Sequence, residues 1–117
     1  MKEIVNERNA KVLRVDLLDE ATGQPVLPTT LEWRLSCETT NQTLSDFAAA
    51  TVETVYDSLG QVIGYRANIQ IPAALNAIQN ANNRQELKVA LVVADRDLDS
   101  EWSKFDSYYV RKVKGRT

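Results

Sequence analysis

Strict alternation of apolar and polar side chains marks residues 31–37, whose sequence is Leu31-Glu32-Trp33-Arg34-Leu35-Ser36-Cys37. A period of two is typical of a β-strand with one buried and one solvated face, because successive side chains point to opposite sides. Trp33 is the largest apolar residue of this run, and its ring would bury roughly 200 Å². We therefore predict that the segment is a strand at the centre of a hydrophobic core.

The remaining chain repeats this pattern in segments that are separated by turn residues. Further strands are predicted at 11–18, 51–57, 61–71, 85–95 and 105–113. Ser58-Leu59-Gly60 predicts a hairpin turn, and Gly64 predicts either a bulge or a close backbone approach in the strand that follows. Residues 44–50 stay ambiguous, because Ser45 could cap a short helical turn there.

The hydrophobic period changes after Ile71. Pro72 suits the first turn of a helix, and Leu75 and Ile78 stand three residues apart. We predict a short helix over 73–81 that crosses from one sheet to the other and caps the core. With about seven strands, this pattern favours an all-β, two-sheet antiparallel sandwich, and a partly open barrel is the alternative.

Length and charge restrict the class of protein. The 117 residues are expected to form a single domain, with 1–8 and 114–117 as extended terminal arms. The net charge of −2 argues against binding nucleic acid, because domains that do so are usually strongly basic. The chain contains neither an apolar run long enough to span a membrane nor a signal peptide, so we expect cytoplasmic synthesis and no membrane partner.

Residues that carry chemistry are scarce in this sequence. Histidine is absent and Cys37 is the only cysteine, which removes the commonest general base and the commonest zinc ligands. The four glycines are scattered and form no phosphate-binding loop. We therefore predict no catalytic residue, no cofactor and no metal site, and we expect Cys37 to be a small buried side chain.

The acidic segment 95–101 is the one feature that resembles a metal site. Its carboxylates occur at alternate positions, as in calcium-binding loops, but Arg96 places a positive charge among them. A solvated hairpin tip is the simpler interpretation, and calcium binding stays open. A hydrolase built on Asp95, Asp97 and Asp99 would need an enclosed site, whereas we expect these carboxylates to be exposed.

The strand predicted at 85–95 is apolar on both faces. We assign to the core the alternating residues Leu87, Val89, Leu91 and Val93. The opposite face then carries Lys88 and an outward apolar strip made of Ala90, Val92 and Ala94. Because water favours polar groups at exposed positions, we predict that a neighbouring element or a partner protein covers this strip.

The last predicted strand adds aromatic and basic contact candidates. Tyr108 and Tyr109 are adjacent and must point to opposite faces, and we predict that Tyr109 lies outside. Arg111 and Lys112 begin a basic tail, for which a mobile solvated end is the simpler interpretation. The alternative is that these charges steer docking onto an acidic neighbouring subunit. A carbohydrate- or receptor-binding adhesion module that uses Trp102 and Tyr109 is the alternative function.

The first third of the chain contains the strand Val15-Asp16-Leu17-Leu18-Asp19, the turn Gly23-Gln24-Pro25-Val26 and the strand Leu31-Glu32-Trp33-Arg34-Leu35. Together these stretches resemble the opening of the immunoglobulin-like domains of tailed-phage baseplate, tail and capsid-accessory proteins. The later segment Ala67-Asn68-Ile69-Gln70-Ile71-Pro72, followed by a short helix and an apolar strand, is similar to the second half of that module.

The resemblance implies an immunoglobulin-like β-sandwich that has no enzymatic activity. Modules of this family mediate contacts between virion subunits, often in rings or on a capsid lattice. Family members usually carry larger fibre or baseplate regions, so for a single domain we expect a capsid decoration, collar or tail-adaptor protein. The resemblance also implies capsid, portal or tail subunits as partners, several copies in one assembly, and a place in the virion after synthesis in the host bacterium.

Overall fold

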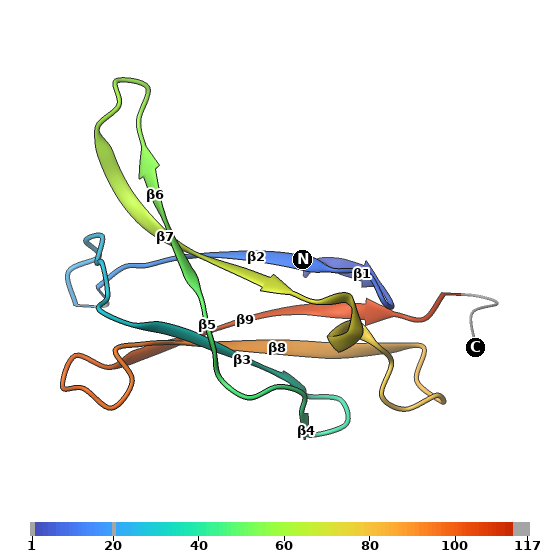
Figure 1. Cartoon of the computed structure of the whole chain (residues 1–117). Helices are drawn as coiled ribbons and strands as arrows, with labels where there is room; N and C mark the ends of the chain where they lie inside the picture. The colour runs from blue at the N-terminus through green and yellow to red at the C-terminus, as the bar shows by residue number, and fades with distance from the viewer. Residues whose placement is uncertain (1, 20, 114–117) are drawn as a thin grey trace.

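The computed structural model describes residues 2–19 and 21–113, and it has two β-sheets packed face to face around one core (Figure 1). Its elements are β1 (Ile4–Asn6), β2 (Lys11–Asp16), β3 (Leu31–Cys37), β4 (Gln42–Thr43), β5 (Ala48–Ala49), β6 (Thr51–Tyr56), β7 (Val62–Ile71), the 3-10 helix η1 (Ala73–Asn76), β8 (Gln85–Ala94) and β9 (Trp102–Arg111). The predicted all-β, two-sheet sandwich is therefore confirmed.

The two sheets differ in size and are mostly antiparallel. The larger sheet has the strand order β1-β9-β8-β3-β4, with β5 also paired to β3, and the smaller sheet has the order β2-β7-β6. Only β1 and β9 pair in parallel among the described strands. β8 and β9 pair over their full length, from Gln85 opposite Arg111 to Ala94 opposite Trp102, and form the most extensive strand pair of the larger sheet.

β3 has the predicted bounds and the predicted buried face. Leu31, Trp33, Leu35 and Cys37 are all buried. The residues of the smaller sheet that share this core are Leu13, Val15, Ala67, Ile69 and Ile71. The alternation in residues 31–37 thus identifies the strand whose inward side chains pack against those of the smaller sheet.

β8 begins at the predicted residue, but the prediction of its two faces is wrong. The residues that were expected outside lie in the core and are 0% exposed, namely Ala90, Val92 and Ala94. Of the four residues that were predicted in the core, Leu87, Val89 and Leu91 are half-buried on the outer face, and Val93, in the same phase, is buried at 5% exposure. The predicted apolar strip therefore cannot contact a partner, because its side chains pack inside the protein.

The register between β3 and β8 explains this inversion. Trp33 lies opposite Val92 and Leu35 lies opposite Ala90, and directly opposed residues in an antiparallel pair share a face. The inward direction of Trp33 therefore decides the inward direction of Val92. Both faces of β8 are apolar, so its own alternation does not distinguish inside from outside.

The crossover from β7 to β8 connects the two sheets as predicted, but it contains less helix. Only η1 is helical, and Ala77 already has an extended backbone with φ −83° and ψ 150°. The backbone N–H groups of Gln79 and Asn80 donate to the carboxylate of Glu86 instead of continuing a helix. Side-chain acceptors of this kind compete directly with helical hydrogen bonds.

Two short segments also differ from prediction. Residues 4–6 form β1 and are paired with β9, so this part of the expected N-terminal arm belongs to the larger sheet. Residues 44–50 form no helical turn, and the Ser45 hydroxyl accepts a hydrogen bond from the Leu35 N–H at 2.9 Å. The predicted C-terminal arm at 114–117 lies outside the described residues.

The β6–β7 hairpin extends beyond the rest of the smaller sheet (Figure 1). β2 pairs with β7 only as far as Arg66, so residues 62–65 have β6 as their one strand neighbour among the described strands. The pairing skips Ile63, which gives the bulge that was predicted beside Gly64. The outer half of the hairpin is therefore a two-stranded ribbon.

The phase of β8 can be tested by placing a charge on each face. We expect Val92→Asp to lower the free energy of unfolding by about 4 kcal/mol, because it buries a carboxylate without a partner. The matched change Leu91→Asp, one residue away on the outer face, should cost no more than about 1 kcal/mol. Urea unfolding of both variants gives the comparison, and equal losses would contradict the assigned faces.

Candidate contact surface and a buried polar cluster

The outer side of the larger sheet carries apolar side chains in register across β8 and β9. Leu87 lies opposite Tyr109, and Leu91 lies opposite Phe105. Side chains at such positions have Cβ atoms about 5 Å apart and contact one another. Phe105 is 67% exposed although it is a large aromatic residue. With Val89, these residues form a continuous patch that we call the outer apolar face.

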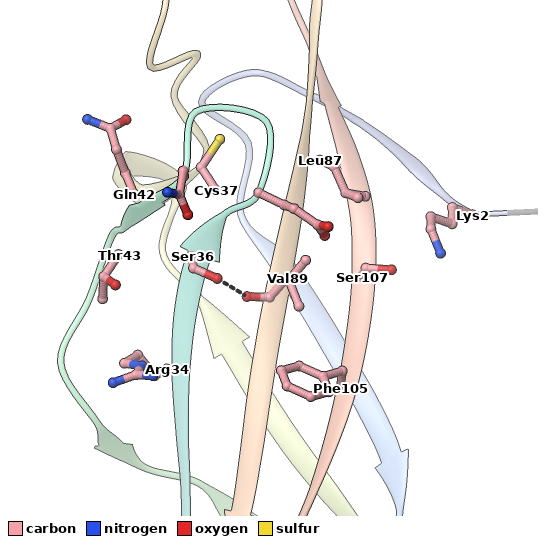
Figure 2. Close-up of a pocket in the computed structure, with 12 residues that line it drawn as sticks. Lys2, Arg34, Ser36, Cys37, Gln42, Thr43, Leu87, Val89, Phe105 and Ser107 are labelled. Carbon is pink, nitrogen blue, oxygen red and sulfur yellow. Dashed lines mark hydrogen bonds between the residues drawn. The ribbon is translucent and has the colours of Figure 1, made fainter.

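The same side of the sheet is hollowed by an open depression of about 580 Å³. Figure 2 shows that its side chains come from β3, β4, β8 and β9, with Phe105 and Val89 as apolar members. Polar and charged groups surround them, among them Lys2, Arg34 and Glu38. The depression therefore combines apolar, polar and charged side chains, which suits the contact of another molecule.

Phe47 lies on the outer side of the larger sheet, away from the depression, and two guanidinium groups contact its ring. The Arg34 and Arg96 guanidinium carbons lie 4.8 Å and 4.5 Å from the centroid of the Phe47 ring. Arg96 also donates two hydrogen bonds to the Glu32 carboxylate, at 2.9 and 3.1 Å, and this pairing raises the pKa of Arg96. Cation–π contacts at such distances fix the ring in place.

The acidic segment after β8 is organised by Asp95. Its carboxylate accepts hydrogen bonds from the backbone of Thr30 at 3.0 Å and Thr29 at 2.7 Å, and from the Ser100 hydroxyl at 2.9 Å. The hydrogen bond from Thr30 lowers the pKa of Asp95 most, and burial opposes it. Within residues 2–19 and 21–113, no three His, Cys, Asp or Glu side chains form a candidate metal site. Asp95 thus fastens the start of β3 to the β8–β9 hairpin.

A buried pair of charged residues was missed by sequence reasoning. Glu86 and Lys88 are both 0% exposed, and the Lys88 ammonium lies 3.2 Å from the Glu86 carboxylate. Lys88 also donates to the carbonyl of Ala77 at 2.9 Å. Lys88 was predicted on the outer face, and it lies inside for the same reason as Val92. Burying two charges is costly unless both are fully hydrogen-bonded.

Glu86 meets that condition through the crossover segment. Its carboxylate accepts the backbone N–H groups of Gln79 at 2.6 Å and Asn80 at 2.9 Å, and the Asn83 amide at 3.0 Å. Burial alone would raise the pKa of Glu86, but these hydrogen bonds and Lys88 outweigh it and lower the pKa to about 2. The pair therefore holds residues 77–83 against the larger sheet.

Tyr108 anchors the same end of the sandwich. It is fully buried, and its hydroxyl donates to the Asn76 side-chain oxygen at 2.6 Å. The Asn76 amide in turn donates to the carbonyl of Asn9 at 2.8 Å, and burial raises the pKa of Tyr108. This chain of hydrogen bonds links β9, η1 and the β1–β2 connection.

The predicted contact residues at the C-terminal end are close to the outer apolar face. Tyr109 is half-buried and points away from the core, which confirms that the two adjacent tyrosines take opposite faces. Arg111 donates to the Asn6 side chain at 3.2 Å, and Lys112 donates to the carbonyl of Ala81 at 2.7 Å. These two cations are thus tied to their own chain, and Tyr109 is the member of the set that joins the outer apolar face.

The two groups of residues differ in what they can do chemically. The cluster around Glu86 and Lys88 is closed to solvent, so it can hold the crossover but cannot meet a substrate in this conformation. The outer apolar face and the depression are accessible and offer contact area. No helix among the described residues has the length and apolar character needed to cross a membrane.

Comparisons of the chain with protein-family models, with curated proteins and with solved structures find no match. Function must therefore be inferred from the residues of this chain and from the surface they form.

The buried pair predicts a specific dependence of stability on pH. The pKa of Glu86 is about 2 in the folded protein, against 4.5 for a glutamate in water, so its ionised form stabilises the fold above pH 4.5. This contribution is lost as the pH falls from about 4.5 to about 2, and it amounts to about 3 kcal/mol.

We expect the unfolding free energy of Glu86→Gln to fall less steeply than that of the wild type over this range. Chemical unfolding at a series of pH values measures the difference, with Glu38→Gln as the exposed control. Parallel curves for wild type and Glu86→Gln would exclude the assigned role of Glu86.

Proposed function

We propose that this protein is a non-enzymatic structural protein of a bacteriophage particle, acting through subunit contacts as a capsid decoration, collar, or tail or baseplate adaptor. The observation that carries the proposal is the outer apolar face. A large exposed aromatic residue, Phe105, lies on it directly opposite Leu91 of the neighbouring strand. An exposed aromatic ring that continues a half-buried apolar face forms the kind of patch at which proteins make contact.

The size of this side of the sheet supports a contact between proteins. Ten residues in each of β8 and β9 give a length of about 30 Å at ~3.4 Å per residue. Four neighbouring strands add a width of roughly 15–20 Å, since strands lie about 4.8 Å apart. The resulting area of about 500 Å² is smaller than the roughly 800 Å² that each partner buries in a stable complex. Adjacent loops must therefore contribute to the interface.

The disposition of charged groups also supports binding over catalysis. The charged groups of Asp95, Glu86 and Lys88 form hydrogen bonds with backbone groups, and Glu86 and Lys88 also form an ion pair. Contact through a rigid surface requires no titrating group, whereas acid–base catalysis requires one that reaches the substrate. The assignment to a phage particle rests on the resemblance of the segments 15–19, 23–26, 31–35 and 67–72 to the immunoglobulin-like modules of tailed phages.

A second candidate function is favoured by the surroundings of Phe105. An exposed aromatic ring beside the hydroxyl and amide groups of Ser107, Thr43 and Gln42 is an arrangement on which a sugar ring could stack. A glycan array distinguishes the two functions. The structural role predicts no glycan bound above background, and selective binding that Phe105→Ala abolishes would favour carbohydrate recognition.

The phage proposal is tested by analysing purified particles. We expect the protein in gradient-purified particles from a producing culture at a constant copy number, as measured by quantitative mass spectrometry. Leu91→Asp should remain folded and fall by roughly tenfold or more in the particle, because it places a charge on a desolvated contact. Leu27→Asp changes a leucine that is 61% exposed and lies off the outer apolar face, so it should be incorporated normally. Absence of the wild-type protein from the particles would contradict the proposal.

A further inference from the structure

The β6–β7 hairpin ends in a concentration of exposed apolar side chains. Tyr56, Leu59, Val62 and Ile63 are between 51% and 83% exposed. They lie at the end of the ribbon that extends past the smaller sheet (Figure 1), and we call residues 56–63 the hairpin tip. A group of exposed apolar side chains such as this is typical of a surface that contacts a partner.

The hairpin tip is held in one conformation. The Asp57 side chain accepts the backbone N–H groups of Leu59 and Gln61, both at 2.9 Å, and Gly60 takes the positive φ of 81° that the turn requires. A two-stranded ribbon is marginally stable alone, yet this turn is well satisfied. A preformed tip loses little conformational entropy on binding, which is the property of an element that inserts into a partner.

The base of the hairpin is also fixed. Glu53 lies 3.5 Å from Arg14 of β2 and 3.6 Å from Arg66 of β7, and it accepts a hydrogen bond from Asn68. The hydrogen bond from Asn68 contributes most to lowering the pKa of Glu53. These contacts join the hairpin to the smaller sheet, so its direction relative to the sandwich is set.

The depression on the larger sheet is complementary to the hairpin tip in polarity and charge. The tip presents exposed apolar side chains, and the open depression of about 580 Å³ has Val89 and Phe105 in its lining. Residues 51–63 carry two acidic side chains and no Lys or Arg, and Glu53 is already paired, so Asp57 gives the tip a negative charge. The depression offers Lys2 and Arg34 against Glu38 alone.

We propose that the hairpin tip of one copy docks into the depression of a second copy of this chain. This inference rests on the proposed structural role, because it identifies a second copy of this chain as a partner that binds at the depression. The two contacting regions are different, so the contact is head-to-tail and leaves each pair with one free tip and one free depression. Repetition closes a ring if the rotation allows it and otherwise extends a filament.

Cysteine cross-linking between copies tests this arrangement. Leu59→Cys labels the tip and Phe105→Cys labels the depression, and both positions are exposed, so neither change should disturb the core. We expect a disulfide-linked dimer when the two single variants are mixed under mild oxidation, and little when either is oxidised alone. The wild type, whose Cys37 is buried, is the blank.

Other cross-linking results would overturn the proposal. A dimer of Leu59→Cys alone means that tips meet tips, and a dimer of Phe105→Cys alone means that two outer faces meet. A mixture that gives no more dimer than the separate variants excludes head-to-tail contact.

The mass in solution gives an independent readout. Sedimentation over a range of concentrations should show wild-type oligomers larger than the 13.1 kDa monomer. Leu59→Asp should weaken this association by roughly tenfold or more, and Leu27→Asp should not. A wild type that stays monomeric throughout overturns the proposal. The phage role would still stand in that case if the protein is found in purified particles.

Discussion

The pairing of β3 with β8 in a single register is the constraint on which the rest of the structure depends. Trp33 must be buried, and its position opposite Val92 turns every second residue of β8 inward. That phase buries Lys88 and Glu86 and leaves Leu87, Val89 and Leu91 half-buried on the outer side. A shift by one residue would exchange the two sets, so the core, the charged pair and the contact surface all follow from one register.

The buried charges in turn explain the end of the sandwich where the chain crosses between sheets. Glu86 accepts hydrogen bonds from backbone N–H groups that would donate within a longer helix over 73–81, and Lys88 donates to the carbonyl of Ala77. The crossover is therefore tied to the larger sheet by polar contacts in place of an apolar helix face. Removal of either charge would leave the other buried without its partner, which is the costly case for an internal ion pair.

The sequence was sufficient for features that depend on local pattern and insufficient for those that depend on pairing. The strand at 31–37, the turn at Gly60 and the bulge beside Gly64 follow from alternation and backbone preference. The faces of β8 could not be decided, because an apolar residue occupies nearly every position. One signal was available: Glu86 and Lys88 continue the phase of Ala90, but charged residues are assigned to solvent unless their partners are known.

The direction of the β8 side chains can be measured by thiol accessibility. Val89→Cys and Ala90→Cys place adjacent probes on the two faces, and the buried Cys37 gives the background. We expect the thiol at position 89 to react with a water-soluble reagent in the native protein, and that at position 90 to react only after unfolding. Protection at 89 together with rapid reaction at 90 would contradict the register and the surface derived from it.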